Sequence, residues 1–109
     1  MLFRSLHTLF MAQYTEMWTA IDLVAERIRA LGELAPQGYG AFGRLSSVQD
    51  GDPSKTAEAM LTELLADHQA LIAAAKTARH GADDVSAAVI DARFDAHQKH
   101  AWMLRATLG

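Results

Sequence analysis

The chain of 109 residues contains no cysteine and only two prolines. Without cysteine, disulfides and thiolate metal sites are excluded, and the absence fits a reducing compartment. No apolar run approaches the roughly 18–20 residues that a transmembrane helix needs, so no membrane span is predicted. The first residues do not join a basic start to a long apolar core, so no signal peptide is predicted. We therefore expect a cytoplasmic protein.

The sequence also lacks a cluster of basic residues. Ten lysines and arginines face thirteen aspartates and glutamates, which gives a formal net charge of −3 at pH 7. Binding to duplex DNA depends on cations placed against phosphates. Nucleic acid is therefore not an expected partner, and no membrane partner is expected either.

Half of the residues are hydrophobic, and alanine and leucine dominate them. This length and composition predict a single helical domain spanning residues 1–109. Apolar residues at steps of three and four predict a first helix over about 3–31, ended by Gly32. Nothing resembling an N-cap precedes Phe3, which suggests a chain shortened at its N-terminus.

Two further long helices are predicted after a connector rich in glycine. Residues 39–45 within the connector are expected to form one or two helical turns. The second long helix is expected over about 55–79, capped by Ser54 or Thr56, and the third over about 84–107, capped by Asp83 or Asp84. Their expected buried positions are Ala59, Met60, Leu64, Leu71, Ile72 and Ala75 in the second, and Val85, Val89, Ile90, Phe94, His97, Ala101 and Leu104 in the third.

Three candidate metal ligands, His7, Asp22 and Glu26, fall on one side of the first predicted helix. At 100° per residue they spread over about a quarter of its circumference. His7 and Asp22 are nevertheless separated by about 22 Å along the axis, so one helix cannot close a site around one metal. Two copies lying antiparallel about a two-fold axis near Thr15 and Glu16 would bring His7 of one copy to Asp22 and Glu26 of the other, twice.

Each candidate also has a purely structural interpretation. Asp22 and Glu26 could be solvated acids beside Arg27 and Arg29, and His7 could be a residue at the edge of the core. The combination of one histidine and two acids, reversed about a common midpoint, favours metal binding. Neutral imidazole with carboxylate is a natural ligand set for iron or zinc.

The remaining histidines indicate structure rather than chemistry. His97 and His100 could bind zinc or copper, but no third ligand has a matching spacing, so a structural role is favoured for both. His68 and His80 are assigned to structure as well. No Glu-x-x-His motif is present, which disfavours a di-iron centre inside the bundle, and the chain shows neither a nucleophilic triad nor a glycine loop for phosphate.

Several segments together resemble the Dps family, the miniferritins named for DNA protection during starvation. Residues 6–10, 13–16 and 25–32, together with Asp22, are similar to the family's second helix. Residues 41–48 resemble its connector, residues 58–72 its third helix, and residues 97–106 its final helix. The resemblance covers essentially the whole chain.

The resemblance implies a ferritin-like four-helix bundle that assembles into a hollow dodecamer, with a ferroxidase centre between two subunits at a two-fold axis. Matched residue by residue, His7 corresponds to the histidine of the family's second helix. Asp22 and Glu26 correspond to the aspartate and glutamate of the partner subunit. The implied activity is oxidation of Fe²⁺ by hydrogen peroxide or dioxygen and storage of the ferric product, with iron as the bound metal.

Two departures from the family pattern weaken that expectation. The family's first helix, with a further iron-binding histidine, is absent, and Met11 stands where the family usually has a carboxylate four residues after His7. A thioether is a poor substitute for a carboxylate on iron.

We expect an all-α, ferritin-like bundle of three long helices and a short connector helix, forming at least a two-fold homodimer. Its expected function is that of an iron-storing ferroxidase, and the alternative is a non-catalytic helical assembly module that keeps the dimer interface.

Overall fold

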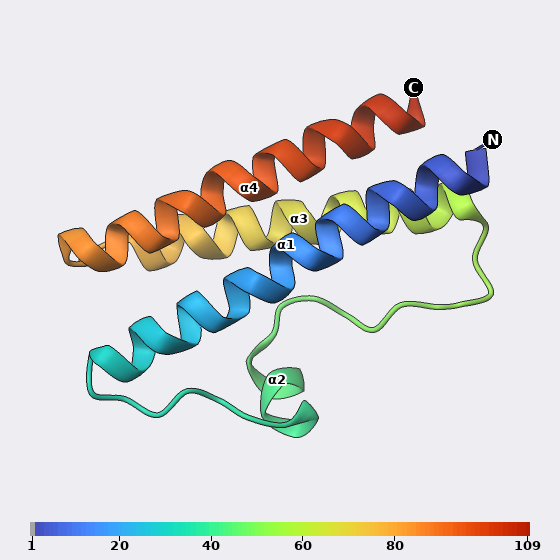
Figure 1. Cartoon of the computed structure of the whole chain (residues 1–109). Coiled ribbons are helices and arrows are strands. Elements are labelled where there is room, and N and C mark those ends of the chain that lie inside the picture. The colour runs from blue at the N-terminus through green and yellow to red at the C-terminus, as the bar shows by residue number, and fades with distance from the viewer. Residues whose placement is uncertain (1) are drawn as a thin grey trace. The chain divides into compact units, whose positions relative to one another are not determined.

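The structure, a computed structural model, describes residues 2–109, and for residues 2–4 and 39 the backbone alone. Its regular elements are the helices α1 (Leu2–Ala30), α2 (Tyr39–Leu45), α3 (Ala57–Arg79) and α4 (Asp84–Leu108) (Figure 1). No strand occurs between residues 2 and 109. The predicted all-α fold of three long helices and one short helix is confirmed, with helix ends within about two residues of those expected.

The chain divides into two compact units, Met1–Ala35 and Pro36–Gly109. The first unit consists of α1 and its C-terminal turn. The backbone N–H of Glu33 donates to the carbonyl of Ile28, and that of Gly32 donates to the carbonyl of Arg29. Gly32 has a φ of 93°, which glycine adopts without steric cost. This pair of hydrogen bonds is the Schellman arrangement, which ends the helix where the sequence predicted.

The second unit contains the short helix α2 and the hairpin of α3 and α4, which pack along each other (Figure 1). Thr56 caps α3, its Oγ1 accepting from the Ala59 N–H at 3.2 Å. Asp83 caps α4, accepting from the backbone N–H and the hydroxyl of Ser86, each at 2.8 Å. Because only four residues join two capped helices, the pair must run antiparallel.

The buried residues of the hairpin are a mixture of apolar and polar side chains. They are Leu61 and His68 on α3, and Ser86, Ala87, His97, His100, Ala101 and Leu104 on α4. Leu61 and His68 are seven residues apart and therefore share one face of α3. The expected burial of Met60 and Val85 is wrong, because each lies about 100° from a residue that faces inward, Leu61 and Ser86 respectively.

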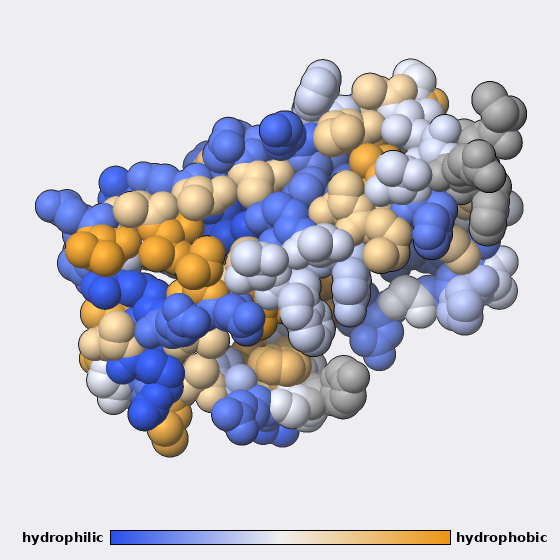
Figure 2. Space-filling view, in the orientation of Figure 1, coloured by the Kyte–Doolittle hydropathy of each residue, from blue (hydrophilic) through white to orange (hydrophobic). Residues whose placement is uncertain are grey.

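Apolar side chains also reach the surface. Space-filling colours show hydrophobic residues between hydrophilic ones on the molecular face in view (Figure 2). On α1 alone, Tyr14, Trp18, Ile21 and Leu23 are each more than half exposed. None of the helices in the described part of the chain has the length and apolar character needed to cross a bilayer.

Candidate metal-binding site

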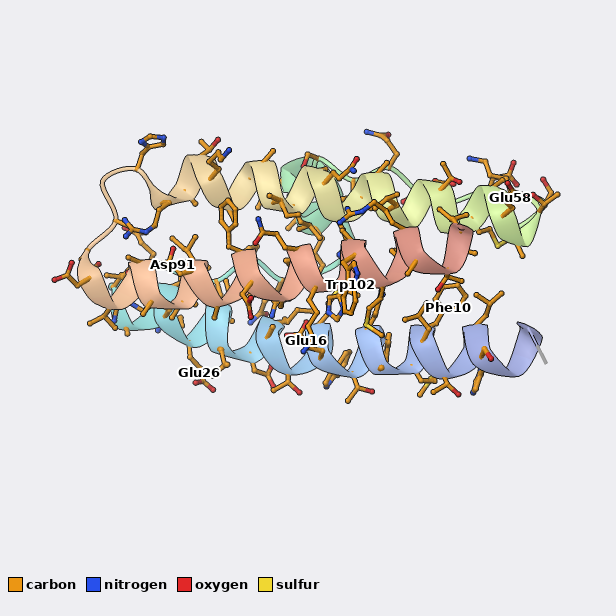
Figure 3. The ribbon with its side chains drawn as sticks, turned by 90° about the horizontal axis from the view of Figure 1, so that it is seen from above. Phe10, Glu16, Glu26, Glu58, Asp91 and Trp102 are labelled. Carbon is orange, nitrogen blue, oxygen red and sulfur yellow. The ribbon has the colours of Figure 1, made fainter. Side chains whose placement is uncertain are left out.

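The three predicted ligands all lie on α1, and all three are solvent-exposed. His7 is near the start of the helix, whereas Asp22 and Glu26 are in its last third. The helical period places Asp22 about 60° and Glu26 about 100° around the axis from His7. The Glu26 side chain projects outward from the α1 ribbon (Figure 3). These residues define a stripe along one side of α1, from His7 to Glu26. Each chain therefore presents an imidazole near one end of this stripe and a carboxylate pair near the other.

These ligands do not meet within one chain. The uninterrupted α1 helix keeps His7 and Asp22 separated by about 22 Å along its axis. Among the residues that the structure describes, no group of three or more histidine, aspartate or glutamate side chains is arranged to hold a metal ion. One chain thus keeps His7 apart from Asp22 and Glu26, and both their role as ligands and the pairing of copies that would join them stay predictions.

The centre of the same stripe is apolar. Tyr14 and Trp18 stack with ring centroids 6.1 Å apart and an interplanar angle of 24°. Trp18 is 63% exposed, Tyr14 59% and Met11 49%. Relative to His7, these three side chains fall within about 40° around the helix. An exposed apolar centre flanked by polar ends is the usual anatomy of a protein interface.

Met11 sits one turn after His7 and on the same side of the helix. Its thioether is a soft ligand, and Fe²⁺ and Fe³⁺ bind oxygen and nitrogen donors better. The stripe's better candidate donors for iron are therefore the imidazole nitrogen of His7 and the carboxylate oxygens of Asp22 and Glu26. This set fits ferrous or ferric iron, although it provides few ligands.

A second cluster of titratable side chains, unrelated to the predicted site, lies between α3 and α4. His68 Nδ1 is 2.9 Å from His97 Nδ1, and His97 Nε2 is 2.9 Å from Nη2 of Arg93. The His100 ring centroid is 5.2 Å from that of His68 and 6.1 Å from that of His97. All three histidines are at least 92% buried. The structural role predicted for these histidines agrees with their burial. Their contact with one another was not predicted from the sequence.

Three side chains with shifted pKa values are Asp52 and Lys55, just before α3, and Asp67, which lies within α3 and directly precedes His68. Hydrogen bonds from the hydroxyl and backbone of Ser54 lower the pKa of Asp52. A 2.8 Å contact with Glu63 raises the pKa of Lys55. Partial burial, and then repulsion from Glu63, raise the pKa of Asp67. Among the described residues, none of these three groups belongs to a cluster of acids and histidines that could hold a metal ion.

Comparison with known proteins identifies the family. The ferritin-like domain matches residues 1–109. DNA protection during starvation protein 2 of Bacillus anthracis is 33% identical over 110 residues, which cover 97% of this chain and 75% of that protein. The DNA protection during starvation protein of Brevibacillus brevis is 31% identical over 110 residues, covering 97% and 74%. A low temperature-induced protein of Nostoc sp. is 34% identical over 111 residues, covering 94% and 61%.

These matches agree with the helical architecture. The family match spans the whole chain, and the similarity to two proteins named for DNA protection during starvation extends over nearly all of it. The order of a long helix, a short connector helix and a long helical hairpin is the order that the resemblance implied. The chain therefore belongs to the Dps family of ferritin-like proteins.

Proposed function

We propose that this protein binds Fe²⁺ between two copies of α1, oxidises it and stores the ferric product. The observation that carries the proposal is the stripe on α1, with an exposed imidazole near one end, two exposed carboxylates near the other and exposed aromatic residues between them. Membership in a ferritin-like family supports iron as the substrate. The minimum assembly in this proposal is a two-fold homodimer, and a dodecamer is its extension.

Simple helix arithmetic supports the pairing. With a two-fold axis crossing α1 between Thr15 and Glu16, His7 lies about 13 Å from the axis along the helix. Asp22 lies about 10 Å and Glu26 about 16 Å from it, on the other side. In an antiparallel copy, His7 therefore falls level with the midpoint between the partner's two acids. Helices pack with axes about 8–10 Å apart, so long side chains on facing surfaces can reach one ion.

The same axis brings the apolar centres of the two stripes together. Tyr14 and Trp18 lie on either side of the axis, so the aromatic pair of one copy faces the pair of the other. Their burial would supply the hydrophobic part of the interface, and it would exclude water from between the two metal sites. A charge placed at Trp18 should therefore prevent both pairing and iron binding.

The side chains of the site have distinct roles in this reaction. Neutral His7 donates a nitrogen lone pair to Fe²⁺, and Asp22 and Glu26 donate carboxylate oxygens whose charge favours the ferric over the ferrous state. Each ferrous ion loses one electron. Hydrogen peroxide accepts an electron from each of a pair of ferrous ions, its O–O bond breaks, and the resulting oxygens take up protons to form water.

The decisive experiment follows ferric absorbance after peroxide is added to the anaerobic protein loaded with Fe²⁺. The wild-type chain should oxidise Fe²⁺ faster than buffer does, and Asp22→Ala should lose about tenfold or more of that rate. His80→Ala is the matched control, because His80 is an exposed titratable residue that follows α3 and has no place in the stripe. Equal rates in wild type, Asp22→Ala and buffer would contradict the proposal.

A second candidate function, a helical assembly module without useful redox chemistry, is favoured by Met11. In that case the α1 interface persists while iron binding is lost. Anaerobic titration calorimetry with Fe²⁺ separates the two functions. Stoichiometric heat that disappears in Asp22→Ala supports the ferroxidase, whereas heat equal to that of dilution, from a protein that light scattering shows to be oligomeric, supports the module.

A further inference from the structure

The buried histidines between α3 and α4 have no part in the proposed iron chemistry. The chain of contacts runs from Arg93 to His97 on α4 and across to His68 on α3, with both joining distances at 2.9 Å. His68 is 1% exposed and His97 5%. A direct hydrogen bond between two imidazole rings across a helix pair is informative, because imidazole can be either a donor or an acceptor.

The donor at one end of the chain determines the proton positions in the rest. An arginine guanidinium has only N–H donors, so His97 Nε2 must accept and carries no proton. The proton of His97 therefore sits on Nδ1 and is donated to His68 Nδ1. His68 Nδ1 then accepts, which leaves the proton of His68 on Nε2. The geometry thus requires that both rings are neutral and that they are opposite tautomers.

An added proton cannot be accommodated without breaking this chain. A proton on His97 Nε2 would face the N–H groups of Arg93, and a proton on His68 Nδ1 would face the N–H of His97. If the Nδ1 proton moved from His97 to His68, His97 would need its own proton on Nε2, again against Arg93. Every protonated state therefore places two donors against each other in a buried position, with the arginine charge nearby.

We propose that the Arg93–His97–His68 chain is an acid-sensitive latch, which holds α3 to α4 while both histidines are neutral and releases the pair when they take up protons. The sign follows from proton binding. Histidines in the unfolded chain titrate near pH 6.5, whereas the latch excludes those protons from the folded state. Stability is therefore full above about pH 6.5 and falls below it, by up to about tenfold in the folding equilibrium constant per pH unit for each histidine.

Three further titratable or charged groups of the hairpin bear on the latch. His100 contributes a third buried imidazole, with its ring 5.2 Å from that of His68. Arg93 is the cation against His97. Asp67 precedes His68 in sequence, and the charges that act on it are Glu63 on α3 and Lys55 just before that helix. The direction of the hydrogen bonds in the latch follows from Arg93, because its guanidinium can only donate.

The test measures unfolding by urea between pH 5.5 and 8, with a metal chelator present so that iron binding plays no part. In wild type the folding equilibrium constant should fall steeply below about pH 6.5. Arg93→Met removes the obligatory donor, so a protonated His97 can still donate to His68. In this variant, unfolding takes up one proton fewer than in wild type. Its folding equilibrium constant should therefore fall about tenfold less per pH unit.

Arg105→Met is the matched control, because Arg105 is exposed on the same helix, and it should keep the steep wild-type dependence. An independent readout on the unaltered chain is ¹⁵N NMR of the histidine rings at pH 7.5. His97 should carry its proton on Nδ1 and His68 on Nε2. A proton found on His97 Nε2, or a pH dependence identical in wild type and Arg93→Met, would overturn the latch, whatever the outcome of the iron assays.

Discussion

Two regions of this protein use histidine in opposite ways. His7 on α1 is exposed, lies on a stripe with two acids, and meets no ligand partner within its own helix. His68 and His97 in the hairpin are buried and hydrogen-bonded to each other. An exposed imidazole keeps a lone pair available for a metal, whereas the buried pair uses its Nδ1 atoms to join two helices. The comparison teaches that the environment of a histidine, rather than its presence in the sequence, distinguishes a candidate metal ligand from a structural residue.

The strongest challenge to this contrast is a pair of alanine substitutions. His68→Ala removes a buried ring and leaves His97 Nδ1 without its acceptor, so we expect a loss of about 2–4 kcal/mol in the free energy of unfolding at pH 7.5. His7→Ala removes an exposed ring and should change stability by less than about 0.5 kcal/mol. Urea unfolding monitored by circular dichroism measures both. Similar losses in the two variants would remove the distinction between the regions.

A second experiment sharpens the chemical side of the contrast. Met11→Asp places a carboxylate one helical turn after His7, where both side chains can bind one ion. If the α1 stripe is a metal site, this variant should bind Fe²⁺ about tenfold more tightly than wild type in anaerobic calorimetry, because iron prefers oxygen to thioether ligands.

The control for that gain is Met103→Asp, an exposed methionine on α4 that lies outside the stripe. It should leave Fe²⁺ affinity unchanged. An equal gain from both substitutions would mean that any added surface charge attracts iron, and would count against a specific site on α1.

The sequence predicted the local structure well because the signals are local. Thr56 and Asp83 cap their helices as expected, and Gly32 ends α1 through hydrogen bonds formed by its immediate neighbours. Ala101 and Leu104 are buried as their spacing indicated. Each of these features depends on residues within about one or two turns, where propensity, capping and periodicity act directly.

The contact between His68 and His97 was not predicted from the sequence, because it depends on how two helices are aligned. In a hairpin whose helices end at Arg79 and start at Asp84, His68 lies level with Asp95, only two residues from His97. That arithmetic was available from the predicted helix ends. The burial of His97 was predicted, but that of His68 and His100 was not, because hydrophobicity assigns inward positions to apolar side chains.

The candidate site shows what the sequence of a single chain does not determine. The sequence supplied His7, Asp22 and Glu26, and the structure places all three exposed on one helix as the period requires. Whether they converge depends on a second copy, and no local rule within one chain determines that pairing. Metal binding by these residues, and the pairing of copies that it needs, therefore stay predictions, to be decided by the assembly and iron experiments.

A smaller effect tests how far the hairpin is specified by its own turn. Asp83→Ala removes the acceptor of two 2.8 Å hydrogen bonds from Ser86 at the start of α4. We expect a loss of about 1 kcal/mol in the free energy of unfolding, the usual cost of a lost N-cap. Asp83→Asn, which can still accept, should recover most of the loss. If both variants unfold alike, the hairpin turn depends on the charge of Asp83 rather than on capping.

The smallest expected effect concerns Asp67, which lies next to the latch in sequence and which we expect to be independent of it. Its pKa is raised by partial burial and by Glu63, so the ionised carboxylate is disfavoured in the folded state relative to the unfolded state. The penalty appears as the pH rises through the unfolded value near 3.8 and is constant above the folded value. Asp67→Asn should therefore stabilise the protein by a few tenths of a kcal/mol at pH 7, since the site is largely solvated.

Asp91→Asn, which weakens an exposed ion pair with Arg79, should leave stability unchanged or slightly lower. Because the Asp67 penalty is constant between pH 6 and 8, the urea midpoints of Asp67→Asn and wild type should differ by the same small amount throughout that range. The latch predicts a steep change over the same interval in both proteins. A gap between them that widens or closes near pH 6.5 would show that Asp67 is coupled to the buried histidines, and the hairpin would then contain one titrating network instead of two.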